Sequence, residues 1–284
     1  MARIVVTGGS GHTGWPVVQH LQTYGHTVTV ADRVAPPGAA PYKLINLEDQ
    51  GQVYGALAGA DAVVHLAAIP RPLYHTPDVV YRTNLLAMAH VLEAMATLGI
   101  PRLVYGSSVS VLGFPFFEQP LAPVYVPVDE AHPCLPQDAY GLTKYLGEAL
   151  IDGFVRRGKL TAVSLRMPWI HTPDSFRRDI GPLQDDPNST TASSNLWGYI
   201  DARDVAEACR LALEAPIAGH EAMFIAAPDT FMRTPTRELL ALHYPNAEIR
   251  GPLDGRAGVL STAKAQRVLG FQARYRWESY PSTG

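Results

Sequence analysis

Tyr140 and Lys144 carry the side chains best suited to proton transfer in this chain. They are four residues apart in the segment 138–157, which Asp138 as N-cap and Gly158 as C-cap predict to be a helix, so both project from one face. Tyrosine, with a pKa of about 10, is a poor base at neutral pH, but a neighbouring ammonium favours its phenolate. Taken alone the pair is also typical of an exposed helix face. In a suitable setting it predicts a tyrosine acid/base activated by lysine.

Ser108 provides that setting. It closes the segment YGSS at 105–108, directly after a short apolar run that is predicted to be a strand. Ligands of open α/β sheets bind beyond the carboxyl ends of the strands. We therefore expect the Ser108 hydroxyl to lie at the same site as Tyr140 and Lys144.

A glycine-rich turn, TGGSGHTG at 7–14, follows the apolar run at 4–6. Its glycines stand where a strand must turn sharply and where a pyrophosphate must approach the start of a helix. Asp32 lies 18 residues after Gly14, close to the ~20 expected for the carboxylate that binds an adenosine ribose diol. The carboxylate would repel a 2′-phosphate and so favours NAD, whereas the adjacent Arg33 would attract one.

Short β-branched runs alternate with helical patterns over most of the chain, which indicates parallel βαβ units. The predicted strands are 4–6, 27–30, 43–45, 62–66, 103–105, 162–165 and 223–226, and the predicted helices are 13–24, 78–98, 138–157 and 202–213. The fold class is thus α/β, a doubly wound parallel sheet of the Rossmann type with a small C-terminal substrate lobe. We expect residues 1–168 to form the NAD-binding domain and 169–284 the substrate lobe, with 202–227 returning to the Rossmann sheet. Runs rich in Gly and Pro at 35–41, 113–136 and 168–187 are predicted to be long loops.

Composition narrows the class of protein. The chain has 284 residues, of which 47% are hydrophobic and 17% charged, with a net charge of −3. These values indicate a globular protein without the excess of basic residues that is typical of nucleic-acid binding. No apolar stretch approaches the ~20 residues of a membrane helix. Two cysteines without CxxC spacing and histidines without HExxH predict no disulfide framework and no metal site, and a reduced, cytoplasmic compartment.

Further motifs follow these in a fixed order. They are HLAA at 65–68, TN at 83–84, SSVSVLG at 107–113, PVDE at 127–130, YGLTK at 140–144, LRMP at 165–168, YIDARDVA at 199–206 and the tail 264–270. Together with the glycine turn they cover nearly the whole chain. By these motifs the sequence resembles the extended short-chain dehydrogenase/reductase family, also called the NAD-dependent epimerase/dehydratase family.

The resemblance implies roles for individual residues. Tyr140 is then the acid/base, Lys144 holds the nicotinamide ribose and tunes Tyr140, and Ser108 hydrogen-bonds the reacting oxygen. Asn46 stands where the family usually has an Asp that contacts adenine. The implied cofactor-binding residues are Gly8, Gly11, His12, Thr13, Gly14, Asp32, Arg33, Asn46, Leu47, Leu66, Ala67, Ala68, Asn84, Tyr140 and Lys144. A homodimer formed through the helices 78–98 and 138–157 is also implied.

Departures from the family pattern narrow the chemistry. Val109 and Ser110 stand where dehydratases of the family carry an Asp-Glu pair, and decarboxylating relatives have a Glu at position 109. Dehydration and decarboxylation are therefore disfavoured. Trp197 stands where nucleotide-sugar epimerases place an arginine that grips the substrate diphosphate. A substrate without a nucleotide is thereby favoured.

Arg177 and Arg178 lie in the predicted loop after Pro173, in a layout similar to that of uronate dehydrogenases, where an arginine receives the sugar carboxylate. A guanidinium fork suits a carboxylate. The alternative is two solvated arginines paired with Asp174 or Asp179. The candidate substrate residues are Ser108, Arg177, Arg178 and Trp197.

The sequence thus predicts an NAD-dependent oxidoreductase that transfers hydride at a secondary alcohol of a small-molecule sugar or sugar acid. One alternative is a nucleotide-sugar epimerase that uses the same residues and retains its NAD. Another is a non-catalytic NAD(H)-binding sensor or scaffold on the same fold.

Overall fold

A computed structural model describes residues 1–280, so the last four residues of the expected lobe 169–284 lie outside the described part. The strands are β1 (Arg3–Thr7), β2 (Thr27–Asp32), β3 (Tyr42–Leu44), β4 (Ala62–His65), β5 (Arg102–Ser108), β6 (Tyr125–Val126), β7 (Thr161–Met167), β8 (Trp169–His171), β9 (Tyr199–Asp201), β10 (His220–Phe224) and β11 (Glu248–Ile249). The α-helices are α1 (Gly14–Thr23), α2 (Gln50–Leu57), α3 (Pro77–Leu98), α4 (Ala139–Arg156), α5 (Pro173–Asp179), α6 (Thr190–Ser194), α7 (Ala202–Glu214), α8 (Thr236–His243) and α9 (Ala263–Leu269). Short 3₁₀ turns are η1 (Val109–Leu112), η2 (Gly181–Leu183) and η3 (Trp277–Ser279).

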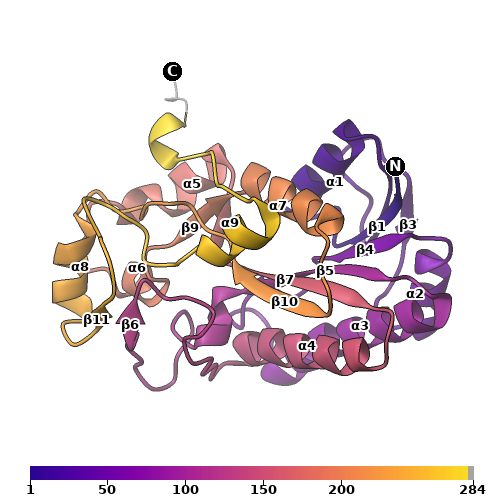
Figure 1. Ribbon diagram of the computed structural model, residues 1–284, viewed down its shortest axis with the longest axis horizontal. Coiled ribbons are helices and arrows are strands. Elements are labelled where there is room, and N and C mark those ends of the chain that lie inside the picture. The colour runs from indigo at the N-terminus through magenta and orange to yellow at the C-terminus, as the bar shows by residue number, and fades with distance from the viewer. Residues whose placement is uncertain (281–284) are drawn as a thin grey trace.

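Seven parallel strands form the main sheet in the order β10-β7-β5-β4-β1-β2-β3. The strand order runs outward from β1 in both directions, through β2 on one side and β4 on the other, which makes the gap between β1 and β4 the switch point where such sheets bind ligands. The doubly wound α/β fold predicted from the sequence is confirmed (Figure 1). Strand β10 closes one edge by pairing with β7 in parallel.

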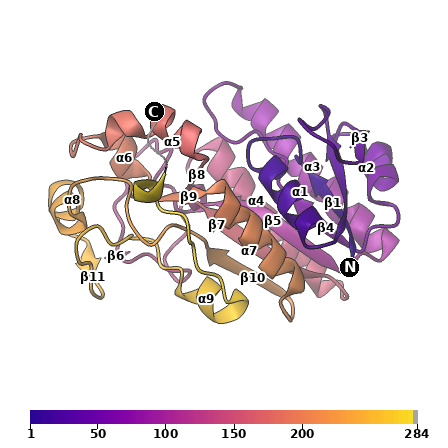
Figure 2. The ribbon, with the colours of Figure 1, turned by 90° about the horizontal axis from the view of Figure 1, so that it is seen from above.

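Helices cover both faces of this sheet, and alternation along β1 shows how. Ile4 and Val6 pack into a core with residues of α1 and α7, while Val5 packs into a second core with residues of α2 and α3. Because successive side chains of a strand point to opposite faces, an all-apolar strand contributes side chains to the cores on both sides of the sheet. Figures 1 and 2 show α1 and α7 together on one side of the strands, with α3 and α4 on the other. Among residues 1–280 no helix is long and apolar enough to cross a membrane.

A smaller region follows the carboxyl ends of β5 and β7. It contains two short parallel pairs, β8 with β9 and β6 with β11, and lies beside the end of the main sheet (Figure 2). Trp197, Tyr199 and Phe231 are fully buried in its core. This region therefore stands next to the edge of the sheet where Ser108 is found.

The segment 168–187 is not the loop that its prolines predicted. It contains β8, α5 and η2. Pro173 occupies the first turn of α5, where its missing N–H costs nothing, and the Thr172 side chain accepts a hydrogen bond from Ser175 N as the N-cap. Arg177 and Arg178 consequently lie on a helix rather than in a loop.

Candidate active site

Ser108 and Tyr140 meet at the carboxyl edge of the sheet. Ser108 is the last residue of β5, and its hydroxyl oxygen accepts a hydrogen bond of 3.1 Å from Ser110 N. Tyr140 lies in the first turn of α4, which Asp138 begins by accepting from Tyr140 N at 2.8 Å. The Ser108 side chain lies against the phenol closely enough to favour its ionised form. The structure thus brings this predicted pair together.

Lys144 lies one turn further along α4 and is almost completely buried. Its Nζ donates a 2.6 Å hydrogen bond to the main-chain oxygen of Gly106, and it lies 4.9 Å from the ring centre of Tyr105 and 5.7 Å from that of Tyr140. The amine is therefore held between the end of β5 and α4.

The electrostatics of the pair differ from the sequence expectation. Burial raises the pKa of Tyr140 to about 12, against the lowering effects of Ser108 and Arg71. Burial also lowers the pKa of Lys144 to about 7, although Glu148 favours the ammonium. Loss of hydration disfavours the charged form of each group, and here it outweighs the neighbouring charges. The expected lowering of the tyrosine pKa by lysine is not seen in this structure.

The glycine turn between β1 and α1 has no room for side chains. Gly8 has a φ of 72°, and a Cβ there would lie 2.6 Å from Ala67 N. A Cβ at Gly14 would lie 2.0 Å from the oxygen of Gly8, to which Gly11 N also donates at 3.1 Å. Thr13, the N-cap of α1, forms no side-chain cap. Trp15 N donates to the oxygen of Gly11 at 3.0 Å and Pro16 has no N–H, so the N–H of Gly14 is the group in the first turn of α1 that can face an anion such as a dinucleotide pyrophosphate.

Asp32 ends β2 beside this turn. Its carboxylate accepts from Ser10 N at 3.0 Å and from Arg33 N at 2.6 Å. The Arg33 guanidinium instead turns to Asn46 Oδ1 at 3.0 Å and to Glu48 Oε1 at 3.1 Å. The carboxylate is therefore fixed at the expected ribose position, while the arginine already has an acidic partner.

The other predicted cofactor residues surround the same edge. Leu66, Ala67 and Ala68 follow β4, and Ala67 packs against Gly8. Leu47 is nearly buried after β3. The Asn84 amide exchanges hydrogen bonds with the backbone of Ile69 and donates to Thr143 Oγ1 at 3.1 Å. The remaining two, His12 and Thr13, lie in the glycine turn.

The predicted substrate residues are not brought together in the same way. Arg177 donates to Asp174 Oδ1 at 2.8 Å, and Arg178 makes a two-pronged contact with Asp179 at 2.8 and 2.9 Å. These are the pairings that the sequence left as the alternative. Trp197 is fully buried with a φ of 51°, and its ring packs edge-on against Tyr244.

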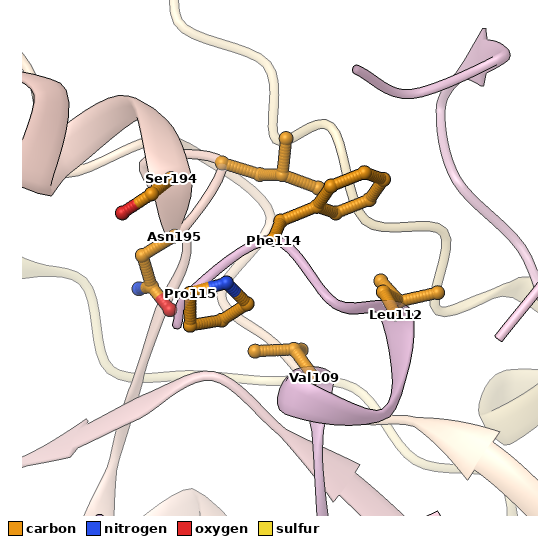
Figure 3. A pocket seen from close by; sticks show the side chains of 7 residues that line it. Val109, Leu112, Phe114, Pro115, Ser194 and Asn195 are labelled. Atoms are coloured by element: carbon orange, nitrogen blue, oxygen red, sulfur yellow. The ribbon is translucent and has the colours of Figure 1, made fainter. Parts of the chain in front are cut away.

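A shallow crevice, with no volume that would admit a water molecule, lies beside η1, the turn that follows Ser108. Figure 3 shows its walls, which come from the turn η1 and the loop after it on one side and from the segment before Trp197 on the other. The lining residues are Val109, Leu112, Phe114, Pro115, Ser194, Asn195 and Leu196. The crevice is thus mostly apolar and has no charged side chain, and its lining includes none of Ser108, Tyr140 and Lys144.

Sequence reasoning missed a buried ion pair behind Lys144. Glu148, one further turn along α4, pairs with Arg166 of β7 at 2.7 Å. The spacing of four residues between Lys144 and Glu148 was a signal for their proximity; the partner on β7 was not predictable without the fold. Within residues 1–280 no group of three or more His, Cys, Asp or Glu side chains is arranged to hold a metal.

Comparison with curated proteins yields both dehydrogenases and epimerases. L-arabinose 1-dehydrogenase (NAD(P)(+)) of Haloferax volcanii is 30% identical over 222 residues, covering 76% of this chain and 84% of that protein. Uronate dehydrogenase of Pseudomonas putida is 26% identical, covering 58% and 60%. UDP-glucose 4-epimerase of Corynebacterium glutamicum is 26% identical, covering 78% and 74%.

Solved structures agree with the fold over nearly the whole chain. A short-chain dehydrogenase/reductase superfamily protein from Agrobacterium tumefaciens with bound NAD matches with a TM-score of 0.74 and 25% identity, covering 97% of this chain and 94% of that one. MoeE5 in complex with UDP-glucose and NAD matches with a TM-score of 0.73 and 26% identity, covering 98% and 95%. Residues 4–226 match the family described as NAD dependent epimerase/dehydratase. With its Rossmann sheet, its glycine turn and its Ser108, Tyr140 and Lys144 site, the chain belongs to the NAD-dependent epimerase/dehydratase family of extended short-chain dehydrogenases/reductases.

Proposed function

We propose that this protein is an NAD-dependent dehydrogenase that oxidises a secondary alcohol of a free sugar or sugar acid. The observation that carries the proposal is the arrangement of Ser108, Tyr140 and Lys144 at the carboxyl edge of the sheet, beside the glycine turn. A hydroxyl donor, a phenol and a buried amine in one place suit proton transfer coupled to loss of hydride. They argue against a sensor or scaffold that has no chemistry to perform.

In the proposed reaction the substrate hydroxyl lies between Ser108 Oγ and Tyr140 Oη. Ser108 hydrogen-bonds the reacting oxygen, and Tyr140 takes the hydroxyl proton as the hydride leaves the carbon. NAD held at the glycine turn and Asp32 would supply the hydride acceptor, and the positive charge of its oxidised ring would favour a nearby phenolate. Lys144 keeps its amine beside the phenol by its bond to Gly106.

NAD fits the residues at the adenosine end better than NADP. Asp32 presents a carboxylate where a ribose 2′-phosphate would be repelled. The guanidinium of Arg33, which would otherwise attract that phosphate, is held by Glu48. Arg82 also pairs with Glu48, at 3.2 Å. Two arginines sharing one carboxylate leave some positive charge at this edge, so the preference for NAD rests mainly on Asp32.

The burial of Trp197 supports a substrate without a nucleotide. Trp197 is sealed in the core of the small region, so the position expected to grip a diphosphate offers no group to the solvent. The second candidate, a nucleotide-sugar epimerase, is favoured by the likeness to UDP-glucose 4-epimerase and to MoeE5.

A sugar acid is the proposed substrate class because of Arg177 and Arg178. Arg177 is about one third exposed and paired with the freely exposed Asp174, so a buried substrate carboxylate could replace that partner.

The proposed homodimer would use α3 and α4, whose surfaces expose Leu86, Tyr145 and Leu146.

The experiment that separates the two candidates is the cofactor content of the purified protein. An epimerase returns hydride to its substrate and has no need to release the cofactor, whereas a dehydrogenase must exchange NADH for NAD in every cycle. We expect protein freed from small molecules by gel filtration to carry NAD in far less than equimolar amount. Stoichiometric NAD after that step would favour the epimerase.

A further inference from the structure

We propose that Glu148 and Arg166 are positioning residues for the catalytic centre: the pair fixes the end of β5 against α4 and sets the electrostatic surroundings of the Lys144 amine. This inference rests on the proposed function, because it assigns the pair a part in the same reaction. Glu148 bonds to Ser107 and Arg166 rather than to Ser108 or Tyr140, so the pair acts through Lys144 and through the strand that carries Ser108.

The contacts of Glu148 connect three elements of the site. Its Oε1 accepts from Ser107 Oγ at 2.6 Å and from Arg166 Nε at 3.1 Å, and its Oε2 accepts from Arg166 Nη2 at 2.7 Å. Ser107 directly precedes Ser108 on β5, Glu148 follows Lys144 by one turn of α4, and Arg166 lies on β7. A single carboxylate therefore ties the serine strand to the helix of the tyrosine and lysine.

Burial makes this pair consequential. The side chains of Glu148 and Arg166 are each only 8% exposed. The attraction within a buried ion pair offsets the free-energy cost of its dehydration only when the geometry is good. Replacing both members of such a pair by apolar residues often leaves the stability of the protein unchanged. The two-pronged contact supplies that geometry. A role in the site explains why two charges are placed there.

The surroundings of Lys144 show what the pair can do. The titratable groups that face it are Tyr140 and Glu148 on its own helix, Tyr105 on β5 and His65 on β4. Of these only Glu148 favours the ammonium. On the far side, Arg166 faces Glu130 and Cys134 as well as Glu148. Arg166 thus neutralises part of the charge that Glu148 directs at the lysine.

Opposite substitutions should then have opposite effects. Glu148→Gln keeps an acceptor for Ser107 but removes the carboxylate that pairs with Arg166 and faces Lys144, which disfavours the ammonium of Lys144. Arg166→Met leaves the Glu148 charge unopposed, which favours it. We expect the pH-rate limb that disappears in Lys144→Met to move to lower pH in Glu148→Gln and to higher pH in Arg166→Met, each by about one unit or more. The double variant should return it towards the wild-type position.

A readout without substrate accompanies the kinetics. The pH dependence of the free energy of unfolding reports the same lysine, because its pKa is about 7 in the folded protein and about 10.4 in the unfolded chain. The free energy of unfolding should therefore increase with pH above about 7. In each variant, the pH at which this increase begins should shift in the same direction as the pH-rate limb. If Arg166→Met does not fold, Arg166→Lys replaces it; this variant keeps the charge, and we expect a wild-type limb with a lower kcat.

The proposal would be overturned if the pH-rate limb shifted in the same direction in both single variants, or if neither readout shifted. A general distortion of the site would not give shifts whose direction depends on the sign of the charge removed. If Arg166→Lys replaces Arg166→Met, a shift of the pH-rate limb in that variant would also overturn the proposal. Absence of NADH formation from every free sugar would instead contradict the proposed function, and the unfolding measurement would still decide the role of the pair.

Discussion

Lys144 donates a 2.6 Å hydrogen bond from Nζ to the main-chain oxygen of Gly106. The bond joins α4 to the strand that ends in Ser108, and it places the amine over the ring of Tyr105. A Cβ at Gly147 would lie 2.5 Å from the Tyr105 hydroxyl, so α4 can approach β5 this closely only with glycine at that position. The distance between helix and strand is thus set by the packing of Tyr105 against Gly147 and by two side-chain hydrogen bonds, this one and the bond from Ser107 to Glu148.

Removal of the phenol should abolish most of the turnover. We expect Tyr140→Phe to lower kcat by about 100-fold or more, the effect of losing a general acid/base. Binding of NADH, followed by its fluorescence, should change little, because the ring is kept. The matched control is Tyr145→Phe, which alters an exposed tyrosine on the same helix. Near-normal turnover in Tyr140→Phe would remove this residue from the mechanism.

Cofactor preference should depend on Asp32 and on the partner of Arg33. Asp32→Ala should weaken NAD binding by roughly ten-fold or more, since a hydrogen bond to a charged group is lost. Glu48→Gln releases the Arg33 guanidinium and should strengthen NADP binding while affecting NAD less. Fluorescence titrations with NADH and NADPH measure both. A wild-type protein that prefers NADP would reverse the assignment.

Substrate charge should be recognised at α5. We expect Arg177→Ala or Arg178→Ala to raise the KM for a uronic acid by about ten-fold or more, because a charged hydrogen bond is lost, and to leave the KM for the corresponding neutral aldose nearly unchanged. Arg250→Ala, which removes another exposed ion pair, serves as the control. Equal effects on the acid and the neutral sugar would show that neither arginine reads the carboxylate.

Acid should destabilise the protein through a buried histidine. Burial, reinforced by Lys144, lowers the pKa of His65 to about 3, whereas an unfolded histidine has a pKa of about 6.5. The unfolded chain therefore binds one more proton between these values, and stability falls as pH decreases through that window, by roughly 1.4 kcal/mol per pH unit. Urea unfolding at pH 4.5 to 6.5 should show a shallower fall in His65→Gln than in the wild type. An unchanged slope would contradict this origin.

Much of the fold was predictable because its signals are local. The apolar runs of β1 and β4 and the glycines between β1 and α1 obey rules of strand burial and close backbone approach that act within a few residues. The segment around Pro173 shows the limit, since a proline that suggests a loop also fits the first turn of a helix. Only the hydrogen bond between Thr172 and Ser175 decides between the two.

The candidate site was predictable where residues share one element and less so where they do not. The spacing of Tyr140 and Lys144 fixed their common helix face, but the pKa values of both depend on burial by β4, β5 and the loops around them. Likewise the partner of Glu148 lies 18 residues along the chain, on another strand. Such contacts are created by the tertiary fold, and no sequence pattern encodes them.

The most direct test of the account is NADH formation by the wild-type protein with a panel of free aldoses and uronic acids, alongside UDP- and GDP-sugars. Absorbance of NADH follows the reaction, and Tyr140→Phe provides the blank. The account predicts NADH from at least one free sugar or sugar acid and none from the nucleotide sugars. Turnover confined to nucleotide sugars, with no free sugar oxidised, would contradict it.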